Sequence, residues 1–242
     1  MPSSSNTKRR LLIVLGSLAG VVVLVLGGTW LYVNVITDDA PEEFTLADGD
    51  DDETDGGNPA PAEDLVLDGT WTIASESEAG YRVDEVLNGL DNTVVGRTSD
   101  VTGEVTVTDS AATAADVVLD MTTVTTDSDS RDGQFQGSIL NTDEYPTSTF
   151  TLTEPVALDD LPTATGPVEQ TASGELTIRD VTREVEVDLQ MQLSGESVEV
   201  VGSIPITFDD FDIDAPDLAF VRVEDEGLVE FLLTLTKADD SP

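Results

Sequence analysis

Apolar and polar residues alternate in many short stretches of this chain, and the most regular stretch runs from Val185 to Leu193. A period of two gives a strand one apolar face and one wet face. Residues 179–182 read as a turn that separates this stretch from a similar one ending at Ile178. Together they predict a β-hairpin in a sheet with one buried face.

Similar stretches, rich in Thr and Val and separated by turn residues, recur along the chain. They predict strands at residues 70–74, 81–87, 92–97, 103–108, 116–124, 148–154, 173–178, 184–193, 198–208 and 228–236. One short helix is expected around residues 132–140. So many strands with so little helix indicate a sandwich or a closed barrel. Because each long strand keeps one wet side, we expect an antiparallel up-and-down barrel over residues 65–239.

The segment before this domain has a different pattern. Residues 11–36 contain no charged residue and would form a helix of about 39 Å, enough to cross a bilayer with some tilt. Lys8, Arg9 and Arg10 precede it, so the positive-inside rule places the basic tail of residues 1–10 in the cytoplasm. The alternative is a cleaved signal peptide, whose apolar core would be shorter, at ~7–15 residues. We therefore expect a single-pass protein of the cell membrane with an extracytoplasmic barrel.

Residues 37–64 are acidic, contain several Gly and Pro, and have few large apolar side chains. Such a composition predicts a disordered linker that repels itself and extends. Within it, Asp51, Glu53, Asp55 and Gly56 are spaced as in a calcium loop. The twelfth position is Ala62, which offers no bidentate carboxylate, so no calcium site is predicted.

The overall composition limits the possible functions. The chain has 50 Asp and Glu against 10 Lys and Arg, a net charge of -40, which repels nucleic acid. It has no His and no Cys, which excludes an ordinary catalytic triad, a thiolate nucleophile and a typical zinc site. We predict no enzyme, no catalytic residue, no cofactor and no metal. The acidic residues at 209–217 could bind a hard cation, but a solvated loop is the reading we favour.

Three motifs occur in a fixed order in the folded part. They are an opening strand with Trp71, an Arg131-Asp132 pair followed by Tyr145-Pro146 and a strand with Phe150, and a Gly-x-Leu-Thr-Ile-x-x-Val-Thr hairpin at residues 174–182. Together they resemble the YceI family, over residues 67–237. The resemblance implies an extended, lipocalin-like barrel that binds a polyisoprenoid or another lipid chain in its interior.

Two elements depart from the family pattern. Gln134 stands where many relatives carry His, and the late Arg-x-Asp-Phe-Gly element retains only Asp210 and Phe211. A polar anchor for a ligand headgroup is therefore not carried over from these positions. The Arg131-Asp132 pair has two readings, a grip on a headgroup or an ion pair that closes the barrel end; we favour the second.

The predicted fold class is thus all-β: a lipocalin-like antiparallel barrel with one short helix, preceded by a single transmembrane helix and an acidic linker. The candidate ligand-binding residues are Trp71, Phe135, Phe150, Leu152, Leu176, Ile178, Val185, Val187, Leu189, Ile204, Ile206, Phe231 and Leu233.

The expected function is to hold an isoprenoid or other lipid chain inside the barrel, close to the membrane that residues 11–36 would enter. The alternative is a solidly packed structural barrel whose acidic surface binds a wall polymer, a protein or a cation. A homodimer is left open.

Overall fold

The computed structural model describes residues 40–46, 65–87, 89–164, 166–218 and 221–238. Within these residues, strands form one 13-stranded antiparallel sheet. The strands are β1 (Gly69–Ile73), β2 (Glu78–Leu87), β3 (Leu90–Thr98), β4 (Val101–Thr108), β5 (Ala111–Asp120), β6 (Thr147–Leu152), β7 (Val156–Ala157), β8 (Val168–Ile178), β9 (Val181–Ser194), β10 (Ser197–Thr207), β11 (Asp217–Leu218), β12 (Val221–Val223) and β13 (Glu226–Lys237).

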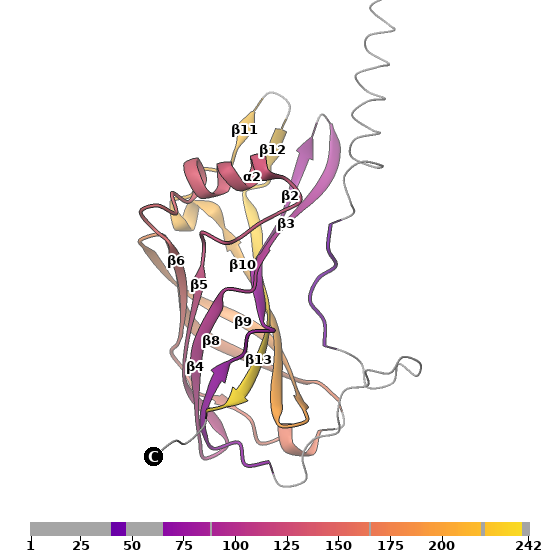
Figure 1. The fold of residues 1–242 in the computed structure, drawn as a ribbon, viewed down its shortest axis with the longest axis vertical. Coiled ribbons are helices and arrows are strands. Elements are labelled where there is room, and N and C mark those ends of the chain that lie inside the picture. The colour runs from indigo at the N-terminus through magenta and orange to yellow at the C-terminus, as the bar shows by residue number, and fades with distance from the viewer. Residues whose placement is uncertain (1–39, 47–64, 88, 165, 219–220, 239–242) are drawn as a thin grey trace, which may run out of the picture.

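Within the described part, 8 strands close into a barrel (Figure 1). Their order is β1, β4, β5, β6, β8, β9, β10 and β13, and β13 pairs back with β1 to complete the wall. Closure removes the free sheet edges that would otherwise attract other strands. The prediction of an all-β antiparallel barrel with one short helix is confirmed.

The last strand, β13, pairs with two different strands along the same edge. Its first part, from Leu228 to Leu232, pairs with β2, and its last part, from Leu235 to Lys237, pairs with β1. The β2–β3 hairpin therefore stands at one end of the barrel, where β12 and β11 extend it (Figure 1).

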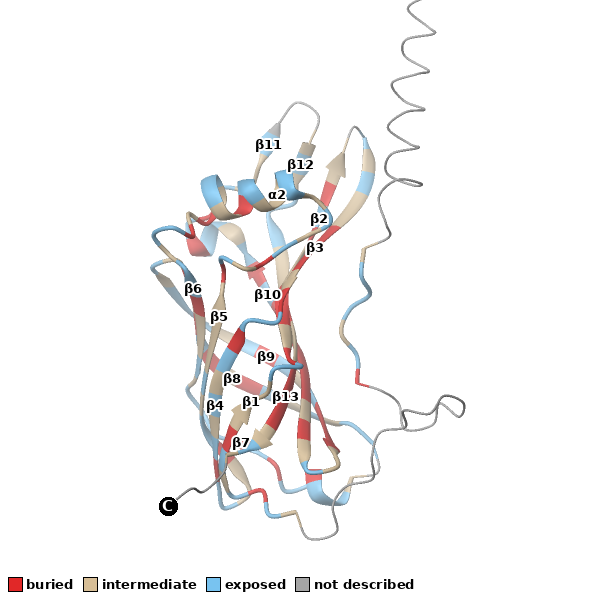
Figure 2. Ribbon diagram, viewed as in Figure 1, coloured by how far each residue is buried: buried red, intermediate tan, exposed pale blue. Residues whose placement is uncertain are grey.

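The hairpin expected from the alternating pattern is present as β8 and β9. Ile178 pairs with Val181, and the two residues between them form the turn, with Arg179 at φ 58°. Buried and exposed residues alternate along the barrel strands (Figure 2), and in β9 Val187 is buried while its neighbour Glu186 is exposed. Gln192 departs from the alternation because it is buried.

The expected helix begins earlier than its sequence pattern indicated. It consists of α2 (Asp129–Gln134) and a π-helical turn, η2 (Phe135–Ile139). Phe135 is buried, and its ring stacks on Tyr81 of β2 with centroids 4.9 Å apart. This contact fixes the helix over the end of the barrel where the β2–β3 hairpin begins to extend (Figure 1).

Each predicted strand has a counterpart, but the bounds of every one differ by at least one residue, and β8 begins at Val168 rather than at residue 173. Two of these differences have a clear local cause. The strand expected at residues 116–124 is β5, which covers residues 111–120. Its first half is Ala-rich and gives little apolar signal, whereas Met121 and Val124 are buried but lie in irregular chain. The strand expected to reach residue 208 ends at Thr207, because Phe208 begins the 3-10 turn η4 (Phe208–Phe211). Strands β7, β11 and β12 are too short to produce a period. A further 3-10 turn, η3 (Leu161–Thr163), precedes β8.

The expected transmembrane segment, residues 11–36, and the calcium-loop-like stretch, residues 50–62, lie outside the described residues. In the part of the chain that is described, no helix has the length and apolarity needed to cross a membrane. Residues 40–46 fall inside the range expected to be a disordered linker. They are extended and lie against the outside of the barrel, with Leu46 buried.

Candidate functional site

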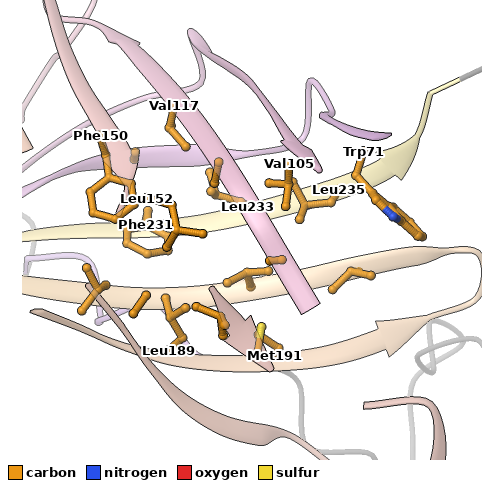
Figure 3. A pocket seen from close by; sticks show the side chains of 18 of the residues that line it. Trp71, Val105, Val117, Phe150, Leu152, Leu189, Met191, Phe231, Leu233 and Leu235 are labelled. Carbon is orange, nitrogen blue, oxygen red and sulfur yellow. The ribbon is translucent and has the colours of Figure 1, made fainter. Parts of the chain in front are cut away.

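The barrel interior contains a cavity with a volume of about 170 Å³ (Figure 3). All eight barrel strands contribute to its wall, which places Val117 of β5, Phe150 of β6 and Leu233 of β13 around one space. A dry cavity of ~150 Å³ lined by Leu, Ile and Phe is large enough to bind benzene. In this conformation the cavity therefore has room for an apolar molecule or for a short segment of an apolar chain.

The lining is almost entirely hydrocarbon. Among the described residues that form it, Ser148 and Thr149 carry the polar side chains. The Ser148 hydroxyl donates a hydrogen bond of 2.7 Å to the Thr177 carbonyl, so it is already satisfied. A ligand inside the cavity would therefore be held by burial of its apolar surface, and a polar headgroup would have to lie elsewhere.

Two glycines on inner faces make room for the aromatic rings. A Cβ atom added at Gly202 would lie 2.5 Å from the Cζ atom of Phe231, and one added at Gly174 would overlap the Phe150 ring. The rings thus lie over strand positions that have no side chain. Without these glycines, Phe150 and Phe231 would be pushed into the space that they now line.

Trp71 fills one end of the cavity (Figure 3). Its side chain is 1% exposed, and its Nε1–H donates a hydrogen bond of 2.7 Å to the Leu67 carbonyl. The indole is thereby fixed in one orientation, with its only polar atom satisfied.

Nine of the residues predicted to bind a ligand line this cavity: Trp71, Phe150, Leu152, Leu176, Val187, Leu189, Ile204, Phe231 and Leu233. Four others lie outside its lining. Phe135, Ile178 and Ile206 are buried in the hydrophobic core, and Val185 packs against that core while half-buried. Ile178 ends its strand and Ile206 lies next to the end of its own, so they pack at the strand ends rather than along the middle of the cavity. Contact of the nine with a ligand stays a prediction.

Several lining residues were absent from the predicted set. They include Val105, Val107, Val117, Leu119, Met191, Val198, Val200, Val229 and Leu235. The alternation of Val105 with Val107 in β4 was a usable signal, and so were the apolar faces of β10 and β13. The contribution of Leu67, Leu158 and Leu161 had no periodic signal, because these residues lie outside the strands.

The Arg131-Asp132 pair does not form an ion pair with itself. The Arg131 guanidinium lies 3.6 Å from a carboxylate oxygen of buried Glu85 and also contacts Asp127. Asp132 instead accepts hydrogen bonds from the backbone N–H and hydroxyl of Thr126, at 2.9 and 2.7 Å. The expected Arg131–Asp132 ion pair is thus wrong, because Arg131 pairs with Glu85 and Asp127 while Asp132 binds Thr126. Both side chains are engaged within the protein.

The Tyr81 ring stacks on Phe135, and burial raises the pKa of the Tyr81 hydroxyl far above the usual value of ~10. Since the folded state holds the proton more tightly than the unfolded state, stability should be complete below pH ~10. It should fall above that pH by up to about 1.4 kcal/mol per pH unit. Urea unfolding between pH 8 and 11 would measure this slope. Tyr81→Phe should flatten it, whereas an unchanged slope would show that another group is responsible.

The acidic residues at 209–217 do not converge. Asp209, Asp210 and Asp212 are exposed, and among the described residues no group of three His, Cys, Asp or Glu side chains is placed to hold a metal ion.

Comparison with known proteins places this barrel among relatives. None of the curated proteins compared with the chain matches it. A solved polyisoprenoid binding domain from Saccharophagus degradans, implicated in plant cell wall breakdown, is similar at TM-score 0.56 and 20% identity, over 69% of this chain and 98% of that one. BcnA of Burkholderia cenocepacia is similar at TM-score 0.50 and 20% identity, over 65% of this chain and 95% of that one. These likenesses establish a shared fold. Residues 71–235, more than half of the chain, match the YceI-like domain, and the protein therefore belongs to the YceI family.

Proposed function

We propose that this protein is a membrane-anchored, extracytoplasmic binding protein that holds an isoprenoid or another lipid chain inside its barrel. The observation that carries the proposal is the apolar cavity inside the barrel, whose wall comes from all eight barrel strands. The similar domain from Saccharophagus degradans is a polyisoprenoid binding domain, which supports the same class of ligand here.

The energetics of this cavity suit a ligand without charged contacts. At ~25 cal/mol per Å², burial of ~200 Å² of ligand surface contributes about 5 kcal/mol. A cavity of about 170 Å³ accommodates only part of a long lipid chain. For more of the lipid to enter, the side chains that line the cavity would have to move. Phe150 and Phe231 are half-buried and sit over glycines, which makes them the rings whose position controls the free volume.

Binding is tested most simply with a fluorescent isoprenoid analogue, titrated into the purified full-length chain. Saturable binding that a non-fluorescent polyisoprenoid displaces would support the proposal. Absence of saturable binding, together with a well-folded barrel, would instead favour a structural barrel whose acidic surface binds other partners.

The proposed topology makes a separate prediction, based on Lys8, Arg9 and Arg10 before an apolar segment. Protease added to intact cells should release an acidic fragment that begins within residues 37–64. Mass spectrometry of the released fragment would locate the cut. Protection of the barrel until the cells are lysed would reverse the topology, and a soluble form released without protease would indicate a cleaved signal peptide.

A further inference from the structure

Residues 40–46, here called the strap, run along the outside of the barrel beside β2 and β3 (Figure 1). Two arginines of these strands bind its backbone. Arg82 donates a hydrogen bond of 2.7 Å from Nη2 to the Pro41 carbonyl, and Arg97 donates one of 2.6 Å from Nη2 to the Glu42 carbonyl. Because these hydrogen bonds are made to main-chain oxygens, they fix the backbone of the strap rather than one of its side chains.

The barrel itself organises the two arginines. Glu230 of β13 is 3% exposed and accepts hydrogen bonds from Nε of Arg82 at 3.0 Å and from Nε and Nη2 of Arg97 at 2.9 and 2.7 Å. One carboxylate thus faces two guanidinium groups, so the three-residue cluster itself carries one excess positive charge. The remaining N–H groups point outward toward the strap, where they bind the Pro41 and Glu42 carbonyls.

Side chains of the strap add to these bonds. The Phe44 ring lies under the Arg97 guanidinium, with the Cζ atom 3.7 Å from the ring centroid. Leu46 is 6% exposed in a segment whose other residues are largely accessible. The strap is therefore held by a cation–π contact, a buried Leu and two charge-assisted hydrogen bonds, which together make a specific docking site.

We infer that the Arg82–Arg97–Glu230 cluster is a docking site for the chain's own residues 40–46, and that the strap fastens the upstream chain to a fixed point on the barrel wall. The consequence for reach rests on the proposed membrane topology. An unfastened linker of residues 37–64 could extend roughly 100 Å, whereas residues 37–39 reach only about 10 Å. With the strap docked, the β2–β3 side of the barrel stays next to the membrane that supplies the ligand.

The chain has no cysteine, so two spin labels can be placed without removing native residues. One is attached at Glu43→Cys in the strap and the other at Glu196→Cys in the exposed turn between β9 and β10. In the full-length chain in phosphatidylcholine nanodiscs, a docked strap should give one narrow distance distribution. Phe44→Ala and Arg97→Ala should each lower the docking equilibrium constant by roughly 10- to 100-fold and broaden the distribution.

Two matched controls accompany these variants. Thr45→Ala changes an exposed strap residue, and Arg183→Ala removes an exposed arginine from another strand; both should keep the narrow distribution. Phe44→Ala leaves the barrel sequence intact, so its effect cannot come from misfolding of the Arg cluster. A broad distribution in the parent, or a narrow one in Phe44→Ala, would overturn the inference.

Dilution with unlabelled chain separates docking within one chain from exchange between chains. The distance should persist on dilution; its loss would mean that the strap of a second copy occupies the site, which would contradict docking within one chain. The experiment uses no lipid ligand for the barrel, so its result is independent of whether the cavity binds an isoprenoid.

Discussion

Replacing Leu189 with Trp should abolish most lipid binding while leaving the barrel folded. Leu189 lines the cavity and is half-buried, so a larger side chain at this position projects into the free space. At ~25 cal/mol per Å², loss of ~100 Å² of ligand contact lowers affinity by roughly 50- to 100-fold. Overpacking of an already filled core would instead cost ~1–3 kcal/mol of stability. Probe titration and thermal unfolding should be measured on the same preparation.

The matched control is Glu186→Trp, on the outer face of the same strand. Glu186 is exposed, so the added indole lies outside the barrel and binding should stay within a factor of about two of the parent. Equal loss of binding in both variants would mean that the ligand does not lie in the cavity. A Leu189→Trp variant that is strongly destabilised would indicate a wall that cannot accept added volume.

Replacing Glu230 with Gln should give the largest loss of stability on the outside of the barrel. The change removes the carboxylate shared by Arg82 and Arg97, whose side chains are 13% and 19% exposed. Loss of one partner from a buried ion pair leaves uncompensated charge and costs ~3–5 kcal/mol. For a domain of this size, the melting temperature should fall by roughly 10 °C.

Calorimetry or circular dichroism would measure this change, with Glu186→Gln as the control. Both substitutions remove one negative charge, but Glu186 is exposed and should change the melting temperature little. Equal, small shifts in the two variants would show that solvent already screens the arginine cluster. Since Glu230 holds both arginines that contact residues 40–46, its loss should also release the strap.

The parts of the fold that could be predicted depend on local signals. The β8–β9 hairpin was predictable because turn residues separate two alternating stretches. The predicted turn at residues 179–182 was too long, since Ile178 pairs with Val181 and only two residues lie between them. The start of β5 was not, because the Ala residues at 111–115 pack on a sheet without a strong apolar period. The first part of the short helix, α2, has no buried residue, and the buried Phe135 and Leu140 come after it, so the pattern placed the helix too late.

The presence of a cavity could not be predicted from the sequence, although some of its lining residues could. Alternation indicates which side chains face inward, and therefore identified Val187 and Ile204 as interior residues. It does not indicate whether facing side chains meet, since that depends on barrel diameter and on partners distant in the chain. Gly174 and Gly202 illustrate this, because their role follows only from the rings of Phe150 and Phe231 on neighbouring strands.

The docking of the strap could not be predicted from the sequence for the same physical reason. Its acidic, Pro-containing sequence lacks the apolar surface needed to fold alone, which is why it reads as linker. Its order comes from Arg82 and Arg97, and these in turn are held by Glu230 from the last strand. No local pattern connects residues so far apart in the chain.

The central claim, that the barrel holds a lipid chain, is tested most directly by mass spectrometry of organic extracts. The full-length parent and the Leu189→Trp variant are purified identically, so lipid carried by residues 11–36 is the same in both. We expect the parent to yield close to one isoprenoid or other lipid molecule per chain, and the variant to be strongly depleted of it. Extracts with the same lipids in the same amounts would contradict the central claim.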